Sequence, residues 1–252
     1  MKKRWAAMTA GVLCQVSLAL SLSLGLLWGA SAPARAAAET FAKPDAEGTV
    51  DVSTDRPART LAIIMSGDGG WWGDLDAQLA NRIAHAGYAV VGLDTNIWFT
   101  SLRTPQEVAD HLSALAQRYM TKTGATKYVL IGYSFGADML APAFSRMSAA
   151  LEAEAGALVM LSPGKNASFQ VNVLEETGVE AGKYSLSADF ARLPKALTTC
   201  LYGEEEKSDT GCTDPALSGA ALVPLPGGHH YNHDTPTLTA HVLGALKRRT
   251  PA

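Results

Sequence analysis

Six short apolar runs constrain the fold of this chain more than any other feature, and they cover residues 61–65, 89–93, 128–131, 157–161, 198–202 and 221–225. Each run has the length of a strand and ends in a turn-rich segment. Runs that are apolar throughout indicate strands buried on both faces, as in a parallel sheet between helices. The sequence therefore predicts an α/β fold with a mostly parallel sheet covered by helices on both faces.

Helical patterns separate several of these runs. The clearest begins at Thr104, where Thr104 and Glu107 have the spacing of a capping box and Pro105 takes the first helical position. We also expect helices over residues 141–155, continuing from the turn at residue 134, and through residues 238–246. Weaker strands are expected at residues 49–53 and, within the irregular segment 162–193, at residues 169–173.

The N-terminal region differs in composition from the rest. Basic residues at positions 2–4 precede a long uncharged run, and small residues surround Ala36 and Ala38. This order predicts a signal peptide over residues 1–38, cleaved near residues 36–38, and a periplasmic protein. An uncleaved anchor is the alternative, because the uncharged run is long enough to span a bilayer. Residues 39–59 would form a polar lead-in segment and residues 60–252 a single domain.

Net charge and the cysteine and histidine positions indicate which partners, cross-links and cofactors to expect. The net charge of −3 and the lack of a basic patch beyond the termini argue against a nucleic-acid partner. Loss of the leader leaves Cys200 and Cys212, which we expect to form a disulfide in an oxidising compartment, with two separate buried thiols as the alternative. The histidines lack the paired spacing of metal ligands, and we expect neither a metal nor a cofactor.

A nucleophilic serine is predicted at Ser134. It lies in a Gly-x-Ser-x-Gly pattern at residues 132–136, directly after one apolar run and before a helical stretch. This strand, turn and helix order is that of the nucleophile elbow in α/β hydrolases. The flanking glycines allow the strand and the helix to approach each other closely. The sequence therefore predicts an α/β-hydrolase fold that exposes Ser134 at the edge of the sheet.

A base and an acid are expected after the serine in chain order. His229 and His230 follow the last apolar run, and we favour His229 as the base while His230 stays open. For the acid we favour Glu206, three residues after Gly203, and Glu205 and Asp209 are the alternatives in the same loop. The disulfide between Cys200 and Cys212 would brace this loop.

The loop after the first run is expected to complete the site. The N–H groups of Phe135 and of Asp68 or Gly69 are predicted to bind the oxyanion. Gly69, Trp71 and Asp74 are expected to contact substrate, and Asp68 and Asp74 to pair with a cationic substrate group. Four aromatic residues would line an apolar pocket or contact a membrane surface, or else pack in the core; they are Trp71, Trp72, Trp98 and Phe99.

These motifs together resemble the VirJ-type bacterial virulence proteins and the similar C-terminal domain of AcvB. The resemblance covers residues 61–246 and rests on segments 66–71, 103–105, 132–138, 202–206 and 225–230. It implies a periplasmic α/β hydrolase and, for AcvB-like members, hydrolysis of the aminoacyl ester of lysyl- or alanyl-phosphatidylglycerol. The resemblance does not extend to the long N-terminal part of AcvB. Two other functions stay open, namely another exported carboxylesterase or thioesterase, and a non-catalytic accessory protein that binds secreted or envelope proteins.

Overall fold

The computed structural model describes residues 41–71, 75–171 and 182–250. The predicted signal peptide, Trp72, Asp74 and the end of the expected strand at residues 169–173 lie outside these residues. Within them, no helix combines the length and apolar character needed to cross a bilayer.

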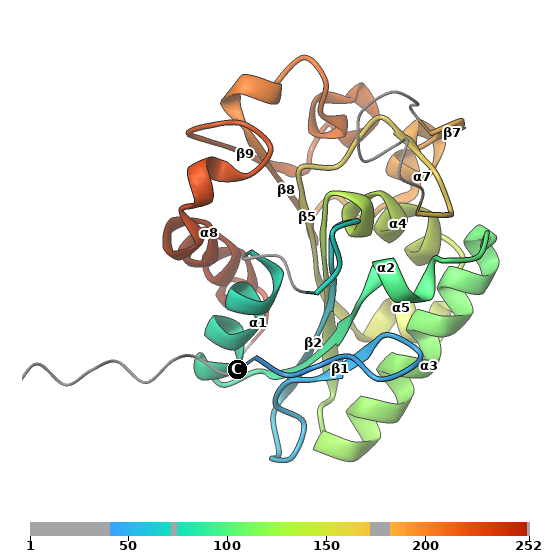
Figure 1. Ribbon diagram of the computed structural model, residues 1–252, viewed down its shortest axis with the longest axis vertical. Helices are drawn as coiled ribbons and strands as arrows, with labels where there is room; N and C mark the ends of the chain where they lie inside the picture. Colours follow the sequence, from blue (N-terminus) through green and yellow to red (C-terminus); the bar gives the residue numbers. More distant parts are fainter. Residues whose placement is uncertain (1–40, 72–74, 172–181, 251–252) are drawn as a thin grey trace, which may run out of the picture. The chain divides into compact units, whose positions relative to one another are not determined.

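A seven-stranded sheet forms the centre of the domain, in the order β1-β3-β2-β4-β5-β8-β9 (Figure 1). Its strands are β1 (Thr49–Asp51), β2 (Thr60–Met65), β3 (Ala89–Leu93), β4 (Lys127–Tyr133), β5 (Ala155–Leu161), β8 (Thr198–Gly203) and β9 (Ala221–Leu225). All neighbours are parallel except the edge strand β1, which is antiparallel to β3. The six predicted apolar runs are therefore strands, as is the weaker segment that begins at residue 49.

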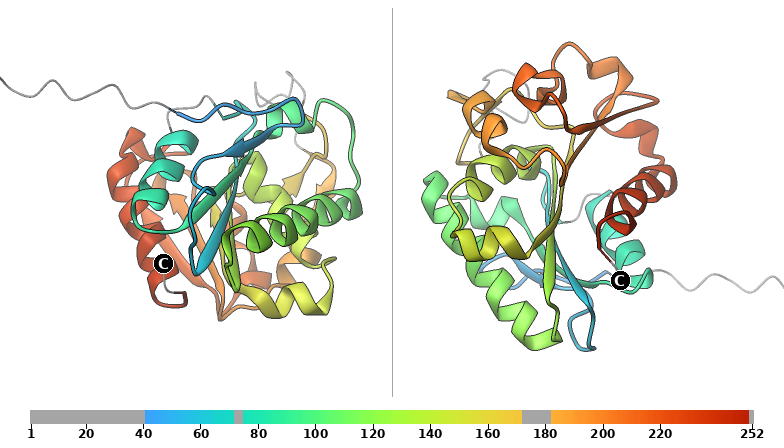
Figure 2. Two further views of the ribbon diagram at one scale, coloured as in Figure 1. Left: turned by 90° about the horizontal axis from the view of Figure 1, so that it is seen from below. Right: turned by 180° about the vertical axis from the view of Figure 1, so that it is seen from behind.

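Helices cover both faces of this sheet (Figures 1 and 2). One face carries α1 (Asp76–His85) and α8 (Thr235–Lys247), and the other carries α3 (Pro105–Thr123) and α4 (Phe135–Phe144). Alternate side chains of β2 point to opposite faces, so that Ile63 lies in one core cluster and Ile64 in the other. The mostly parallel α/β fold predicted from the sequence is confirmed.

Capping explains where the longest helix begins and ends. The Thr104 hydroxyl accepts from the Glu107 N–H, and the Glu107 carboxylate accepts from the Thr104 N–H at 2.7 Å, which is the predicted capping box. Gly124 ends α3 in the left-handed conformation, with φ of 73°. The described residues also form the short helices α2 (Thr95–Trp98), α5 (Ala149–Glu154) and α7 (Ser187–Arg192), and the 3₁₀ turns η1 (Glu204–Glu206), η2 (Gly211–Thr213), η3 (Pro215–Leu217) and η4 (Tyr231–His233).

The expected continuous helix over residues 141–155 is wrong. The helix α4 stops at Phe144, and the N–H of Met147 turns back to the carbonyl of Phe144. Ser148 then takes an extended conformation, and its hydroxyl accepts from the N–H of Leu151, which starts α5 as a separate helix. A helix-capping serine thus interrupts a segment that has helical spacing throughout.

The strand expected at residues 169–173 is also wrong for its described part. Residues 169–171 make isolated backbone hydrogen bonds, from Val171 N–H to the Phe99 carbonyl and from Arg103 N–H to the Phe169 carbonyl. The short ladder in this region lies elsewhere, where β6 (Asn166–Ala167) pairs antiparallel with β7 (Tyr184–Ser185).

Candidate active site

The candidate residues gather at one edge of the sheet because each follows the carboxyl end of a parallel strand. Ser134 comes directly after β4, Glu206 lies three residues after β8, and His229 lies four residues after β9. Asp68 similarly follows β2. Carboxyl ends of parallel strands meet at the same edge of an open α/β sheet, which is where such folds bind ligands.

Ser134 occupies a sharp turn that glycines make possible. Its φ of 50° and ψ of −119° lie outside the regions that a serine normally adopts. A Cβ on Gly132 would lie 2.4 Å from the carbonyl oxygen of Gly136, and a Cβ on Gly136 would lie 2.5 Å from the carbonyl oxygen of Met65. The N–H of Ser134 donates to the Leu161 carbonyl of β5 at 2.9 Å. The turn is therefore fixed between β4, α4 and the neighbouring strands.

His229 connects this serine to an acid. Its Nε2 lies 2.8 Å from Ser134 Oγ, and its Nδ1 lies 2.8 Å from Glu206 Oε2. His230 takes a different position, with Nδ1 2.6 Å from the Tyr133 hydroxyl. Burial, followed by the charges of His229 and His233, lowers the pKa of His230. The geometry therefore favours His229 over His230 as the base.

Glu206 is held by more than the histidine. Its Oε1 accepts from the backbone N–H of Gly203 at 3.0 Å and from the hydroxyl of Ser162. Burial raises the pKa of Glu206, but hydrogen bonds from His229, Ser162 and Gly203 outweigh it and hold the pKa below its ordinary value. The carboxyl is thus ionised at neutral pH. The alternative acids, Glu205 and Asp209, are exposed and do not contact His229.

Two residues of this network escaped the sequence analysis. Ser162 lies directly after β5 with φ of 51°, and Tyr231 is buried with φ of 51°. The Tyr231 hydroxyl lies 2.7 Å from Ser162 Oγ and 3.1 Å from the carbonyl oxygen of Leu201. Neither residue belongs to a motif, and only the fold brings them to Glu206.

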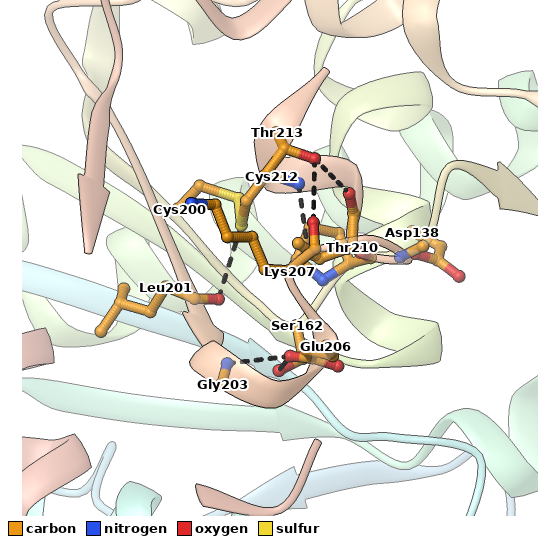
Figure 3. The surroundings of a disulfide bond; sticks show 12 residues. Asp138, Ser162, Cys200, Leu201, Gly203, Glu206, Lys207, Thr210, Cys212 and Thr213 are labelled. Carbon is orange, nitrogen blue, oxygen red and sulfur yellow. Dashed lines mark hydrogen bonds between the residues drawn. A yellow bond between two sulfur atoms is a disulfide. The ribbon is translucent and has the colours of Figure 1, made fainter. Parts of the chain in front are cut away.

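The predicted disulfide between Cys200 and Cys212 is confirmed, and it closes the loop that carries Glu206 (Figure 3). Cys200 lies in β8 and Cys212 in η2, and both are fully buried. The loop is further fixed by the N–H of Gly211, which donates to the Pro163 carbonyl at 2.7 Å. The covalent link and this bond anchor the far end of the acid loop.

Free N–H groups are available where an oxyanion would form. Phe135 begins α4, so its N–H points out of the first helical turn. In the loop after β2, the N–H of Gly69 donates to its neighbour Asp68 at Oδ1, whereas the N–H of Asp68 has no partner among the described residues. The structure therefore favours Asp68 over Gly69 as the second donor. Gly69 itself is exposed beside Ser134 in the same pocket.

The expectation that Trp71 contacts substrate is wrong. Its side chain is 1% exposed and packs in the core beside α1. The ring lies over Gly92, where a Cβ would come within 2.3 Å of it. Phe99 is likewise buried, in edge contact with Phe135, and Trp98 stacks on His111. Trp71 and Phe99 therefore pack in the core, which was the alternative to lining an apolar pocket or contacting a membrane surface.

A pocket of about 240 Å³ opens beside Ser134. It is lined by Gly67, Asp68, Gly69, Gly70, Leu75, Asp76, Tyr133, Ser134, His229, His230, His233 and Thr235. One lining residue, Asp76, is an acid that the sequence analysis did not single out, and it is only 2% exposed. Burial, and then the charges of Asp94 and Asp68, raise the pKa of Asp76 to about 8. Across the described part of the chain, no cluster of His, Cys, Asp or Glu side chains is arranged to hold a metal ion.

Comparisons with known proteins agree with this architecture. The family model "Bacterial virulence protein (VirJ)" matches residues 59–250, whereas no curated protein matches significantly. An esterase from Pyrococcus furiosus has a similar structure, with a TM-score of 0.58, 15% identity, and coverage of 80% of this chain and 86% of that chain.

Two further solved structures are similar. A serine hydrolase without a lid from Xanthomonas campestris gives a TM-score of 0.53 at 18% identity, covering 84% of this chain and 88% of that chain. Est1E from Butyrivibrio proteoclasticus, solved with ferulic acid bound, gives a TM-score of 0.56 at 14% identity. This match covers 76% of this chain and 90% of that chain. At these identities the likeness establishes the α/β-hydrolase fold.

Proposed function

We propose that this chain, which belongs to the VirJ family of bacterial virulence proteins, is a serine ester hydrolase with Ser134 as its nucleophile. The observation that carries the proposal is the relay from Ser134 through His229 to Glu206, in which both hydrogen bonds measure 2.8 Å. A serine hydroxyl is a weak nucleophile until an adjacent base accepts its proton. A binding module has no need of this relay, which argues against a non-catalytic accessory role.

The geometry supports a two-step acyl transfer. Ser134 Oγ attacks the ester carbonyl while its proton passes to His229 Nε2, and Glu206 stabilises the resulting imidazolium through Nδ1. The N–H groups of Phe135 and Asp68 bind the oxyanion. His229 then protonates the leaving alcohol. In the second step His229 activates a water molecule, which releases the acid and restores Ser134.

For the substrate we propose the aminoacyl ester of aminoacyl-phosphatidylglycerol, with the lysyl or alanyl group transferred to Ser134 and phosphatidylglycerol leaving. Support comes from the resemblance to AcvB at segments 66–71, 132–138 and 225–230, and from the leader-like segment at residues 1–38, which fits a periplasmic enzyme at a membrane surface. The His229 side chain is 41% exposed, so a bulky lipid ester can reach the relay.

Incubation with vesicles that contain lysyl- or alanyl-phosphatidylglycerol tests this substrate. We expect release of the free amino acid by the wild-type protein and none by Ser134→Ala. Turnover of a simple ester without release from either lipid would show another carboxylesterase or thioesterase instead. Location is tested separately by fractionation, with the mature protein beginning near residue 37 or 39 in the periplasm.

A further inference from the structure

Asp76 is a buried acid in the wall of the Ser134 pocket, and the proposed mechanism does not use it. It is 2% exposed and begins α1. In the part of the chain that the structure describes, its Oδ2 accepts a single hydrogen bond, from the N–H of Gly67 at the long distance of 3.4 Å. Among the described residues, Oδ1 has no hydrogen-bond partner, and no cation forms an ion pair with the carboxyl. A buried acceptor without a donor is costly, so this group needs an explanation.

The electrostatic surroundings of Asp76 indicate what kind of group would stabilise its carboxyl. The described charged groups that act on it, Asp94 and Asp68, are acidic. Burial and these two charges raise its pKa to about 8. Among the described residues, Oδ1 therefore lacks a hydrogen-bond donor, and the carboxyl lacks a positively charged partner. A primary ammonium supplies both, because it carries three N–H donors and a unit charge.

Asp76 also lies close to the reacting serine. Gly67 separates the two residues, since its N–H bonds to Asp76 and a Cβ built on it would lie 3.5 Å from Ser134 Cβ. All three residues line the same pocket of about 240 Å³. A substituent on the acyl side of an ester at Ser134 can therefore reach Asp76 within this pocket by extending past Gly67.

We infer that Asp76 determines specificity by binding a primary ammonium group on the acyl portion of the ester. This inference rests on the proposed ester hydrolysis at Ser134 and assigns a residue to the recognition of its acyl group. On binding, the carboxyl of Asp76 releases its proton to solvent and pairs with the ammonium as a carboxylate. The proposal gives Asp76 the cation-binding role that the sequence analysis expected of Asp68 and Asp74.

Three glycerol esters of matched shape test the inference. Their acyl groups are 2-aminopropanoyl, 2-hydroxypropanoyl and 2-methylpropanoyl, which differ only in an ammonium, a hydroxyl or a methyl group. For the wild-type protein we expect kcat/KM to be roughly 10- to 100-fold higher for the amino ester than for the methyl ester, as a charge-assisted hydrogen bond in a buried site implies. Asp76→Asn, which keeps the side-chain shape, should remove most of that ratio.

Asp68→Asn is the comparison variant for the other acid of the pocket, which is partly open to solvent. Because the Asp68 N–H is proposed to bind the oxyanion, only the ratio between the esters is compared for this variant, and its absolute rate is not. This variant should keep most of the preference for the amino ester, since solvent screens the charge of Asp68. A ratio that survives in Asp76→Asn, or that is lost only in Asp68→Asn, would overturn the inference. Equal kcat/KM values for the hydroxyl and amino esters would also overturn the inference. They would show that Asp76 stays protonated and acts as a neutral hydrogen-bonding group.

Binding separates this inference from the proposed hydrolysis. Titration of Ser134→Ala with the same three esters needs no turnover, and the amino ester should bind roughly tenfold more tightly than the methyl ester. Adding Asp76→Asn to that variant should remove the difference. If the wild-type protein binds the amino ester selectively but hydrolyses none of the esters, only the proposed ester hydrolysis is contradicted. If it hydrolyses all three esters without selectivity, only the role of Asp76 is contradicted.

Discussion

His229 Nδ1 lies 2.8 Å from Glu206 Oε2, and the other ring nitrogen lies 2.8 Å from Ser134 Oγ. The acid thus fixes the tautomer and the orientation of the imidazole, so that Nε2 is free to accept the serine proton. Glu206 is in turn held by the Gly203 N–H and the Ser162 hydroxyl, and the disulfide from Cys200 closes its loop.

Glu206→Gln should reduce kcat/KM for ester hydrolysis by roughly three to four orders of magnitude, because an amide neither fixes the tautomer nor stabilises the imidazolium. Initial rates with a simple ester measure the effect. Glu205→Gln is the control, since Glu205 is exposed in the same 3₁₀ turn and should stay near the wild-type rate. If the two variants lose activity equally, Glu206 is not the acid.

Loss of the disulfide should destabilise the domain. For a link between residues 12 apart, the chain-entropy model gives roughly 3 kcal/mol, and Cys200→Ser with Cys212→Ser should lower the free energy of unfolding by about that amount. Urea denaturation with and without reductant measures it. The double variant should be insensitive to reductant, and a wild-type protein equally stable after full reduction would contradict a stabilising link.

Asp76 should make stability depend on pH in a direction opposite to that of most acids. Its pKa rises on folding from 3.8 to about 8, so the folded state binds the proton more tightly than the unfolded state. The stability this contributes is present below the unfolded pKa and is lost as the pH rises through the folded pKa. As the pH rises from about 4 to about 8, the free energy of unfolding of Asp76→Asn should therefore increase relative to that of wild type.

Urea denaturation of the two proteins across that range measures the change. The difference between their free energies of unfolding isolates Asp76 from the other titrating groups. A difference that stays constant with pH would show that Asp76 keeps an ordinary pKa in the folded protein.

The strands and the turn at Ser134 could be predicted because they depend on short stretches of sequence. The apolar runs became strands because burial on both faces requires them to be apolar throughout. The turn at Ser134 was predictable because Gly132 and Gly136 are the residues that its close contacts demand. Chain order and positions after strands limited the base to His229 or His230 and the acid to Glu206, Glu205 or Asp209, and only the folded geometry separates these alternatives.

The features that escaped prediction depend on contacts between distant segments. Trp71 follows a glycine-rich turn and therefore suggested a pocket, but Gly92, on the neighbouring strand, leaves a space that its ring fills. Ser162 and Asp76 carry no motif, and their proximity to Glu206 and Ser134 exists only in the folded chain. The break before α5 depends on one capping hydroxyl, that of Ser148, against a helical pattern that spans it.

The rate of ester hydrolysis by Ser134→Ala, compared with wild type, tests the central claim most directly. The account predicts a loss of roughly 10⁴-fold or more, with unchanged far-UV circular dichroism, because the hydroxyl is the nucleophile and does not contribute to packing. A Ser134→Ala protein that hydrolyses the ester at the wild-type rate would contradict it.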